Sequence, residues 1–220
     1  MGLDMYLEKM PRYKNTTVEE VMVIENYFSY LNSAKDCSFE EWSGCSKSKL
    51  PSEDVINFYK PYYRAYYSSW DTGKNYPWRS LTEEVGYWRK ANQIHNWFVE
   101  NVQNGVDDCG YYECTEEDLD KLLEICMTVK NGITMVPGKI HAGTTYHNNG
   151  TVTENYEDGM VIEDTSIAEE LLPTCAGFFF GGTAYDECYM EDIDYTIKLL
   201  QNVLATTDFE KEMICYHSSW

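Results

Sequence analysis

The run from Tyr87 to Val99 (YWRKANQIHNWFV) constrains the fold more than any other part of the chain. Placed on a wheel at about 100° per residue, it separates into an apolar stripe and a polar edge. The stripe comprises Tyr87, Ala91, Ile94, Phe98 and Val102. The edge comprises Trp88, Asn92, His95 and Val99, with Arg89 and Asn96 on its outer side. This pattern predicts a helix that packs on a core and presents an indole, an amide and an imidazole to a neighbouring group.

Polar residues three positions apart predict where helices begin. Ser80 and Glu83 have the spacing of a capping box, which would start this central helix, and Asn104-Gly105 is a typical helix end. Thr17 and Glu20 have the same spacing. Further helix starts are predicted at Thr115, at Ser166 with Glu169, and at Thr183 with Asp186. The last of these opens a long helix with apolar residues on one side.

Alternation of apolar and polar residues predicts the strands. Residues 3–9 alternate, residues 111–114 suit a brief strand, and Phe178 to Phe180 suit a buried one. The segment 133–163 is rich in Thr, Val, Ile and Tyr, and the turn from His147 to Thr151 predicts a β-hairpin excursion. We expect an α+β fold with about three main helices over a small, mostly antiparallel sheet, built from residues near 3–9, 111–114, 133–161 and 177–180.

The length of 220 residues suits a single domain, 1–220, with insertions. Residues 35–79 differ in composition from their surroundings and are predicted to be a helical and aromatic insertion. Their tyrosine-rich run, Tyr59 to Trp70, has two readings. It could be a stacking platform or lid, or it could supply buried aromatic area over a secondary core, which is the more frequent use of such segments.

The excess of acidic over basic residues limits the classes of partner that the chain can bind. Asp and Glu outnumber Lys and Arg by 37 to 17, which gives a formal net charge of −20. Nonspecific affinity for nucleic acid comes mostly from basic residues on phosphates, so we expect no nucleic acid polymer as partner. An anionic membrane is disfavoured for the same reason. The acidity either serves solubility or forms a decoy surface that imitates a phosphate backbone and occupies a basic host protein.

The eight cysteines are expected to be free thiols. The start of the chain has no basic stretch followed by an apolar one, and no run suits a membrane span, so we expect a cytoplasmic protein in a reducing compartment. Cys109 and Cys114, with His141 or His147, could be considered as zinc ligands. Their spacing fits known zinc sites poorly, and we expect no metal and no cofactor.

A glycine pair precedes the last predicted helix. Gly181-Gly182-Thr183 would place a turn between a strand and a helix N-terminus, where backbone N–H groups can bind an anion. The same arrangement is the commonest way to join a strand to a helix, and the lysine of a P-loop is missing. Both interpretations stay open at this stage, with the plain joint favoured.

Four segments together resemble a family of small bacteriophage accessory proteins. They are the opening MGLDMYL, the run Tyr87 to Val99, the turn Val106 to Cys109, and the block from Glu170 to Ile193 that contains GFFFGGTAYDE. The resemblance covers both ends and the middle of the chain and brings no catalytic residues with it. It implies a phage protein made in the host bacterial cytoplasm. Such proteins often counter host defence, some by sequestering nucleotide signals and others by blocking a host enzyme.

The preferred hypothesis is a protein that binds and sequesters a small nucleotide-like ligand without catalysis. Trp88 would stack on a base, Arg89 would meet a phosphate, and Asn92 and His95 would read polar edges. The expected ligand-binding residues are Trp88, Arg89, Asn92, His95, Gly181, Gly182, Thr183 and Tyr185. The plainer alternative for Asn92 and His95 is a satisfied polar pair inside a helix–sheet interface.

Two other functions are considered. The chain could be a phosphoesterase or a nucleotide-hydrolysing enzyme with His95 as general base and Asp107, Asp108 or Glu187 as its orienting group or metal ligand. It contains none of the familiar hydrolase motifs, so we rank an enzyme below a binding protein. The chain could also be an acidic inhibitor of a host defence protein. The C-terminal segment, rich in apolar residues, could dock on the body or on a second copy in a homo-oligomer.

Overall fold

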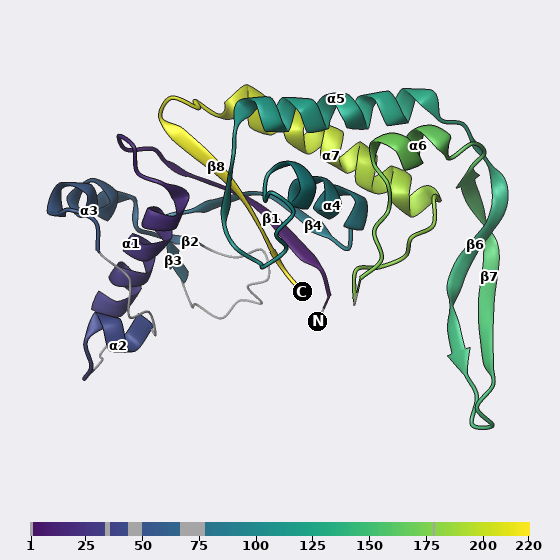
Figure 1. Ribbon diagram of the computed structural model, residues 1–220, viewed down its shortest axis with the longest axis horizontal. Helices are drawn as coiled ribbons and strands as arrows, with labels where there is room; N and C mark the ends of the chain where they lie inside the picture. Colours follow the sequence, from purple (N-terminus) through teal and green to yellow (C-terminus); the bar gives the residue numbers. More distant parts are fainter. Residues whose placement is uncertain (1, 34–35, 44–49, 67–77, 178) are drawn as a thin grey trace.

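A computed structural model describes residues 2–33, 36–43, 50–66, 78–177 and 179–220 and shows an α+β fold (Figure 1). Its main sheet has the strand order β4-β1-β8-β5 and is antiparallel throughout. These strands are β1 (Asp4–Pro11), β4 (Glu83–Arg89), β5 (Tyr112–Cys114) and β8 (Glu212–Ser219). The first and last long strands of the chain therefore pair at the centre of the sheet.

Alternation along the central strands places side chains on two faces. In β1, Met5 and Leu7 are completely buried on one face, whereas Tyr6 and Glu8 are half-buried on the other. In β8, Ile214 and Tyr216 face the first core, and Met213 and Cys215 face a second. Burial on both faces explains why β8 lacks the polar–apolar alternation of an ordinary surface strand.

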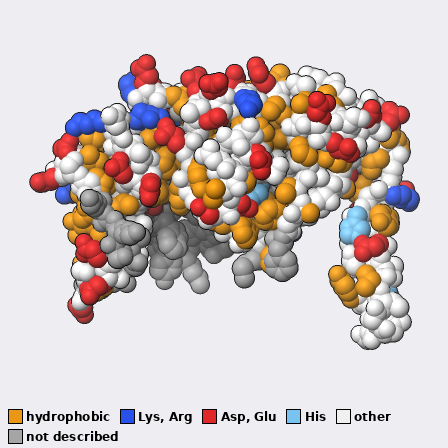
Figure 2. All heavy atoms as spheres, viewed as in Figure 1, with side chains coloured by type: hydrophobic (Ala, Val, Ile, Leu, Met, Phe, Trp, Pro, Cys, Tyr) orange, Lys and Arg blue, Asp and Glu red, His pale blue; other side chains and the backbone are white. Residues whose placement is uncertain are grey.

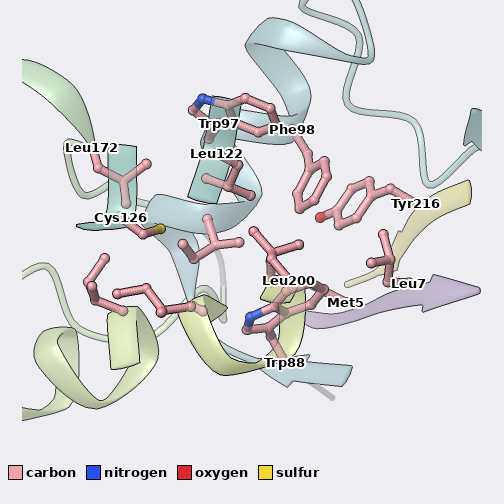
Figure 3. Close-up of a cluster of buried hydrophobic side chains, with 14 of the residues drawn as sticks. Met5, Leu7, Trp88, Trp97, Phe98, Leu122, Cys126, Leu172, Leu200 and Tyr216 are labelled. Carbon is pink, nitrogen blue, oxygen red and sulfur yellow. The ribbon is translucent and has the colours of Figure 1, made fainter. Parts of the chain in front are cut away.

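Three helices cover the first face: α4 (Asn92–Asn101), α5 (Glu116–Gly132) and α7 (Glu187–Thr206), with the short α6 (Ser166–Leu171) beside them. In this core the rings of Phe98 and Tyr216 stack with their centroids 4.0 Å apart (Figure 3). The expectation that the central helix lies on the sheet is confirmed for α4. Burial of this apolar set is the main source of stability for the fold.

The second core lies at one end of the opposite face. It is formed by α1 (Val18–Leu31) and α3 (Glu53–Tyr59), which pack on Met10, Met213 and Cys215. Further described elements of this region are α2 (Phe39–Ser43), the 3₁₀ turn η1 (Lys60–Tyr62), and the strand pair β2 (Arg64–Tyr66) and β3 (Trp78–Ser80). The last part of the run Tyr59 to Trp70, residues 67–70, lies outside the described residues, and the insertion at 35–79 within a single domain stays a prediction.

Several local predictions are confirmed. Thr17 and Glu20 form the predicted capping box of α1, and Thr115 forms one with Asp118 at the start of α5. The hairpin is present as β6 (Met135–Tyr146) and β7 (Val152–Ile162). It forms a two-stranded sheet of its own and projects from the body as an arm (Figure 1), so the prediction that it belongs to the main sheet is wrong.

The central run is not one helix. Residues 83–89 are the edge strand β4, in which Trp88 is paired with Met5 of β1, and the helix begins only at Asn92. The predicted capping box at Ser80 and Glu83 is therefore wrong. Lys90 adopts a left-handed backbone conformation, with φ of 63°, and this sharp turn ends the strand before the helix starts. The apolar stripe suits a helix, but the first residues of the run pair with β1 and form the end of β4 instead.

The predicted strand at 177–180 is also wrong. The described residues there form irregular loop structure. Phe179 has a φ of 69° and is 48% exposed, whereas Phe180 is buried, and Phe178 lies outside the described residues. The main sheet instead contains β8, from residues nearer the end of the chain, which were not predicted to form a strand. Within the described residues, no helix combines the length and apolar composition needed to cross a membrane.

Candidate functional site

A cleft of about 410 Å³ opens where the end of β4, the start of α4, the loop before α7 and the arm come together. Its polar lining includes Arg89, Lys90, Gln93, His141, Asp186 and Asp192, together with the backbone of Gly181 and Gly182. Segments from four distant parts of the chain therefore contribute to one concavity. Its volume lies within the range of about 300–1,000 Å³ usual for small-molecule sites.

The turn between β4 and α4 positions the cationic end of the cleft. The Lys90 N–H donates to the Leu3 carbonyl at 2.8 Å, and the Lys90 carbonyl accepts from the Asn92 N–H at 2.9 Å. Gly181 packs against this turn with a φ of 96°, and a Cβ there would lie 3.2 Å from the Lys90 carbonyl oxygen. A glycine is required at this close approach, and the contact holds the loop beside the turn.

Two cations lie at this end. The Arg89 side chain is 51% exposed, and its guanidinium lies 3.5 Å from the Asp4 carboxylate. The adjacent Lys90 is exposed. Both cations approach Gly2, where a Cβ would lie 3.4 Å from Lys90 Cε and 3.7 Å from an Arg89 nitrogen. Because the two positive charges are neighbours, this end can attract an anion although the chain is acidic.

Asn92 shapes the loop that borders the cleft. Its side-chain N–H groups donate to the carbonyls of Gly182 at 2.7 Å and Phe180 at 3.3 Å, and its side-chain oxygen accepts from the Cys175 N–H at 2.8 Å. The residue is only 1% exposed. Its hydrogen-bonding capacity is therefore used within the chain, and its role is to hold the Gly181-Gly182 segment in place.

Three carboxylates, those of Asp186, Glu191 and Asp192, also line the cleft. Gln93, which is buried, donates from its side-chain amide to Asp192 at 3.0 Å. Burial raises the pKa of Asp192 to about 6; the Gln93 hydrogen bond lowers it, and the negative charges of Glu191 and Asp186 raise it further. Perturbed carboxyl groups in clefts are frequent at functional sites. The cleft is thus polarised in the sense that Arg89 and Lys90 give its lining positive charge and the three carboxylates give it negative charge.

Trp88 and His95 do not line this cleft. The Trp88 indole is 2% exposed and donates to the Thr196 hydroxyl at 2.9 Å. His95 is equally buried; its Nδ1 lies 2.7 Å from the Tyr216 hydroxyl and its Nε2 lies 3.2 Å from Asp107. Burial lowers the pKa of His95, so the ring is neutral. Both side chains are satisfied polar members of the core, which matches the plainer alternative for His95.

The predicted loop residues divide into two groups. Gly181 and Gly182 line the cleft, whereas Thr183 and Tyr185 support the loop from outside it. The Thr183 carbonyl accepts from the Thr174 hydroxyl at 3.1 Å, and the Tyr185 hydroxyl accepts from the Thr174 N–H at 3.3 Å. Asp186 caps α7 by accepting from the Cys188 N–H at 2.9 Å. Since that carboxylate already occupies the N-terminus of α7, a phosphate site there is disfavoured.

The groups considered for catalysis lie in separate places. Asp107 accepts from His95 and from the Trp220 indole at 3.0 Å, while Asp108 accepts from the Gly110 N–H at 2.9 Å. Glu187 accepts from the Met160 N–H at 3.3 Å at the base of the arm. Among the described residues, no group of three or more His, Cys, Asp or Glu side chains is placed to hold a metal ion.

The residues named as possible zinc ligands have structural roles or are engaged with other groups. Cys114 is buried, and burial raises its pKa well above the usual value. The His141 ring lies 2.5 Å from Glu154 across the arm. The seven described cysteines, Cys37, Cys109, Cys114, Cys126, Cys175, Cys188 and Cys215, are free thiols.

Sequence reasoning missed Gln93 and Asp192 and did not place Lys90 among the site residues. Lys90 and Gln93 belong to the run Tyr87 to Val99, but a continuous helix would point them away from the polar edge. Asp192 lies 99 residues from Gln93, and no local pattern links the two.

Comparisons of the chain with models of known protein families, with curated proteins and with solved structures found no match.

Proposed function

We propose that the cleft binds a small nucleotide-like ligand and sequesters it without catalysis, as an accessory protein that removes a phage-restricting signal would do. The observation that carries this proposal is the polarised lining of one cleft. Arg89 and Lys90 supply charge for a phosphate, and the Gln93–Asp192 pair supplies a hydrogen-bonding surface for a polar base. A purely anionic ligand would suit the cationic end only, whereas a nucleotide has groups for both.

The phosphate end is supported by charge and by backbone geometry. Hydrogen bonds from arginine to phosphate are stronger than neutral ones, and a guanidinium offers several donors. Gly181 and Gly182 lie beside the two cations and have no side chain to block an approaching phosphate; at Gly182 a Cβ would meet nothing within 4 Å. An anion could therefore reach both the side chains and the loop backbone.

The alternatives have less support. His95 as a general base would need access to a substrate, but both ring nitrogens are engaged within the core and the ring lies outside the cleft lining. The inhibitor hypothesis rests on the net charge of −20 and on no particular surface. We therefore place sequestration first.

Isothermal titration calorimetry with linear and cyclic nucleotides tests the proposal. Arg89→Gln and Lys90→Asn should each weaken binding on the order of tenfold, as loss of one charge-assisted contact predicts. Asparagine is chosen at position 90 because it tolerates a positive φ. Nucleotide recovered from the complex should have an unchanged mass.

The matched control is Lys198→Ala, which removes an exposed cation of α7 that lies outside the cleft lining. It should leave affinity unchanged. Absence of nucleotide binding by the unmodified protein, or equal affinity in the Arg89 and control variants, would contradict the proposed site.

A further inference from the structure

The Asp192 carboxylate in the cleft lining is held in place before any ligand arrives. Asp192 stands on the first half of α7, and Gln93 on the first turn of α4 reaches across to it. Gln93 is 2% exposed, so its amide cannot swing into solvent. Groups fixed in this way lose little freedom when a ligand binds, which favours both affinity and selectivity.

The charge of Asp192 is not neutralised within the described part of the chain. The Gln93 hydrogen bond is the one interaction that lowers the pKa of Asp192, and it opposes burial and two neighbouring carboxylates. A carboxylate accepts hydrogen bonds and, when ionised, donates none. At neutral pH this part of the cleft therefore favours a ligand edge that presents N–H donors, and it disfavours an edge that presents lone pairs.

We propose that Asp192, oriented by Gln93, recognises the base of the ligand through two adjacent N–H donors, so that the ligand is a guanine nucleotide. This inference rests on the proposed function, because Arg89 and Lys90 would hold the phosphate of the same molecule.

Guanine alone among the common bases presents two neighbouring donors, N1–H and the 2-amino group, to the two oxygens of one carboxylate. Adenine and cytosine present a donor next to an acceptor, and the acceptor would face a carboxylate oxygen. Uracil presents one donor between two carbonyl oxygens. A site built around hydrogen bonds rejects analogues that leave its buried polar groups unpaired.

Calorimetry with GMP and IMP near neutral pH tests this recognition, because the two nucleotides differ only by the 2-amino group. The unmodified protein should bind GMP on the order of tenfold more tightly than IMP, the discrimination that one bidentate pair provides. Asp192→Asn replaces one acceptor oxygen with a donor and should bring the two affinities together. Asp194→Asn is the matched control, since Asp194 pairs with Lys130 at 2.5 Å and does not line the cleft.

The outcomes separate this inference from the proposed function. Equal affinity for GMP and IMP, with both weakened in Arg89→Gln, would overturn guanine recognition and leave nucleotide binding in place. Discrimination retained by Asp192→Asn, or tighter binding of AMP than of GMP, would also overturn it. If the unmodified protein binds none of these nucleotides, the proposed function fails as well. Circular dichroism of Asp192→Asn shows whether the variant is folded.

Discussion

At the scale of single residues, His95 shows how a reactive side chain becomes part of a scaffold. Its ring contacts the edge of Phe180 with centroids 5.1 Å apart and bridges Tyr216 to Asp107. Truncation would leave a cavity and an unpaired buried hydroxyl. We therefore expect His95→Ala to lower the free energy of unfolding by about 3 kcal/mol, measured by urea denaturation.

The control for this prediction is His147→Ala at the exposed turn of the arm, which should leave the urea midpoint unchanged. Below its own melting transition, the His95 variant should still bind nucleotide. Unchanged stability combined with lost nucleotide binding would instead indicate that His95 contributes to the binding site.

At the scale of secondary-structure elements, the arm is separate from the core. Its outer part is exposed on both faces, because every residue of β7 from Val152 to Asp158 is exposed. Tyr146 is 79% and Tyr156 60% exposed, and the base of the arm is held by a hydrogen bond from the Ile162 N–H to the Tyr185 carbonyl. Ile140 and Glu157 are paired across it. Replacing residues 141–156 with Asn-Gly should close a shorter hairpin at this pair. The melting midpoint should change by no more than about 2 °C in scanning calorimetry.

Ile162→Asp provides the contrasting variant, because Ile162 at the base of the arm is buried in the main core. It should lower the midpoint strongly, since an unpaired charge in an apolar core is costly. A large fall in the melting midpoint of the shortened-arm variant would show that the outer arm is stabilised by contacts with a second copy.

At the scale of the whole molecule, acidic residues outnumber basic ones by 37 to 17. In Figure 2, Asp and Glu side chains outnumber Lys and Arg along the upper edge of the molecule, over α5. A net charge of −20 destabilises the compact state by self-repulsion, and salt screens it. Raising NaCl from about 0.01 M to about 0.15 M shortens the screening length from about 30 Å to about 8 Å. The melting midpoint should rise by about 2–4 °C, equivalent to about 1 kcal/mol.

Choline chloride at equal ionic strength should give the same rise if screening is the cause. A midpoint that falls with salt would mean that ion pairs such as Arg12–Glu113, at 2.6 Å, outweigh the general repulsion.

Local chemistry determined much of the fold. The capping box of α1, the start of α5 at Thr115, the alternation in β1 and the turn of the arm each depend on residues a few positions apart, and sequence reasoning found all of them. Pairing between distant segments was not readable in this way. The strand β8 and the change from β4 to α4 within the run Tyr87 to Val99 exist because β1 offers hydrogen bonds on both sides.

The same division applies to the candidate site. The sequence by itself indicated Arg89, Asn92, Gly181 and Gly182 as ligand-binding candidates, and the structure brings these four together at one cleft. Only the tertiary structure decided that Trp88 and His95 face the core and that Asp192 meets Gln93 across 99 residues. The physical reason is that the strand pairing of β4 sets which face each side chain takes, and that pairing depends on a partner strand far away in the chain.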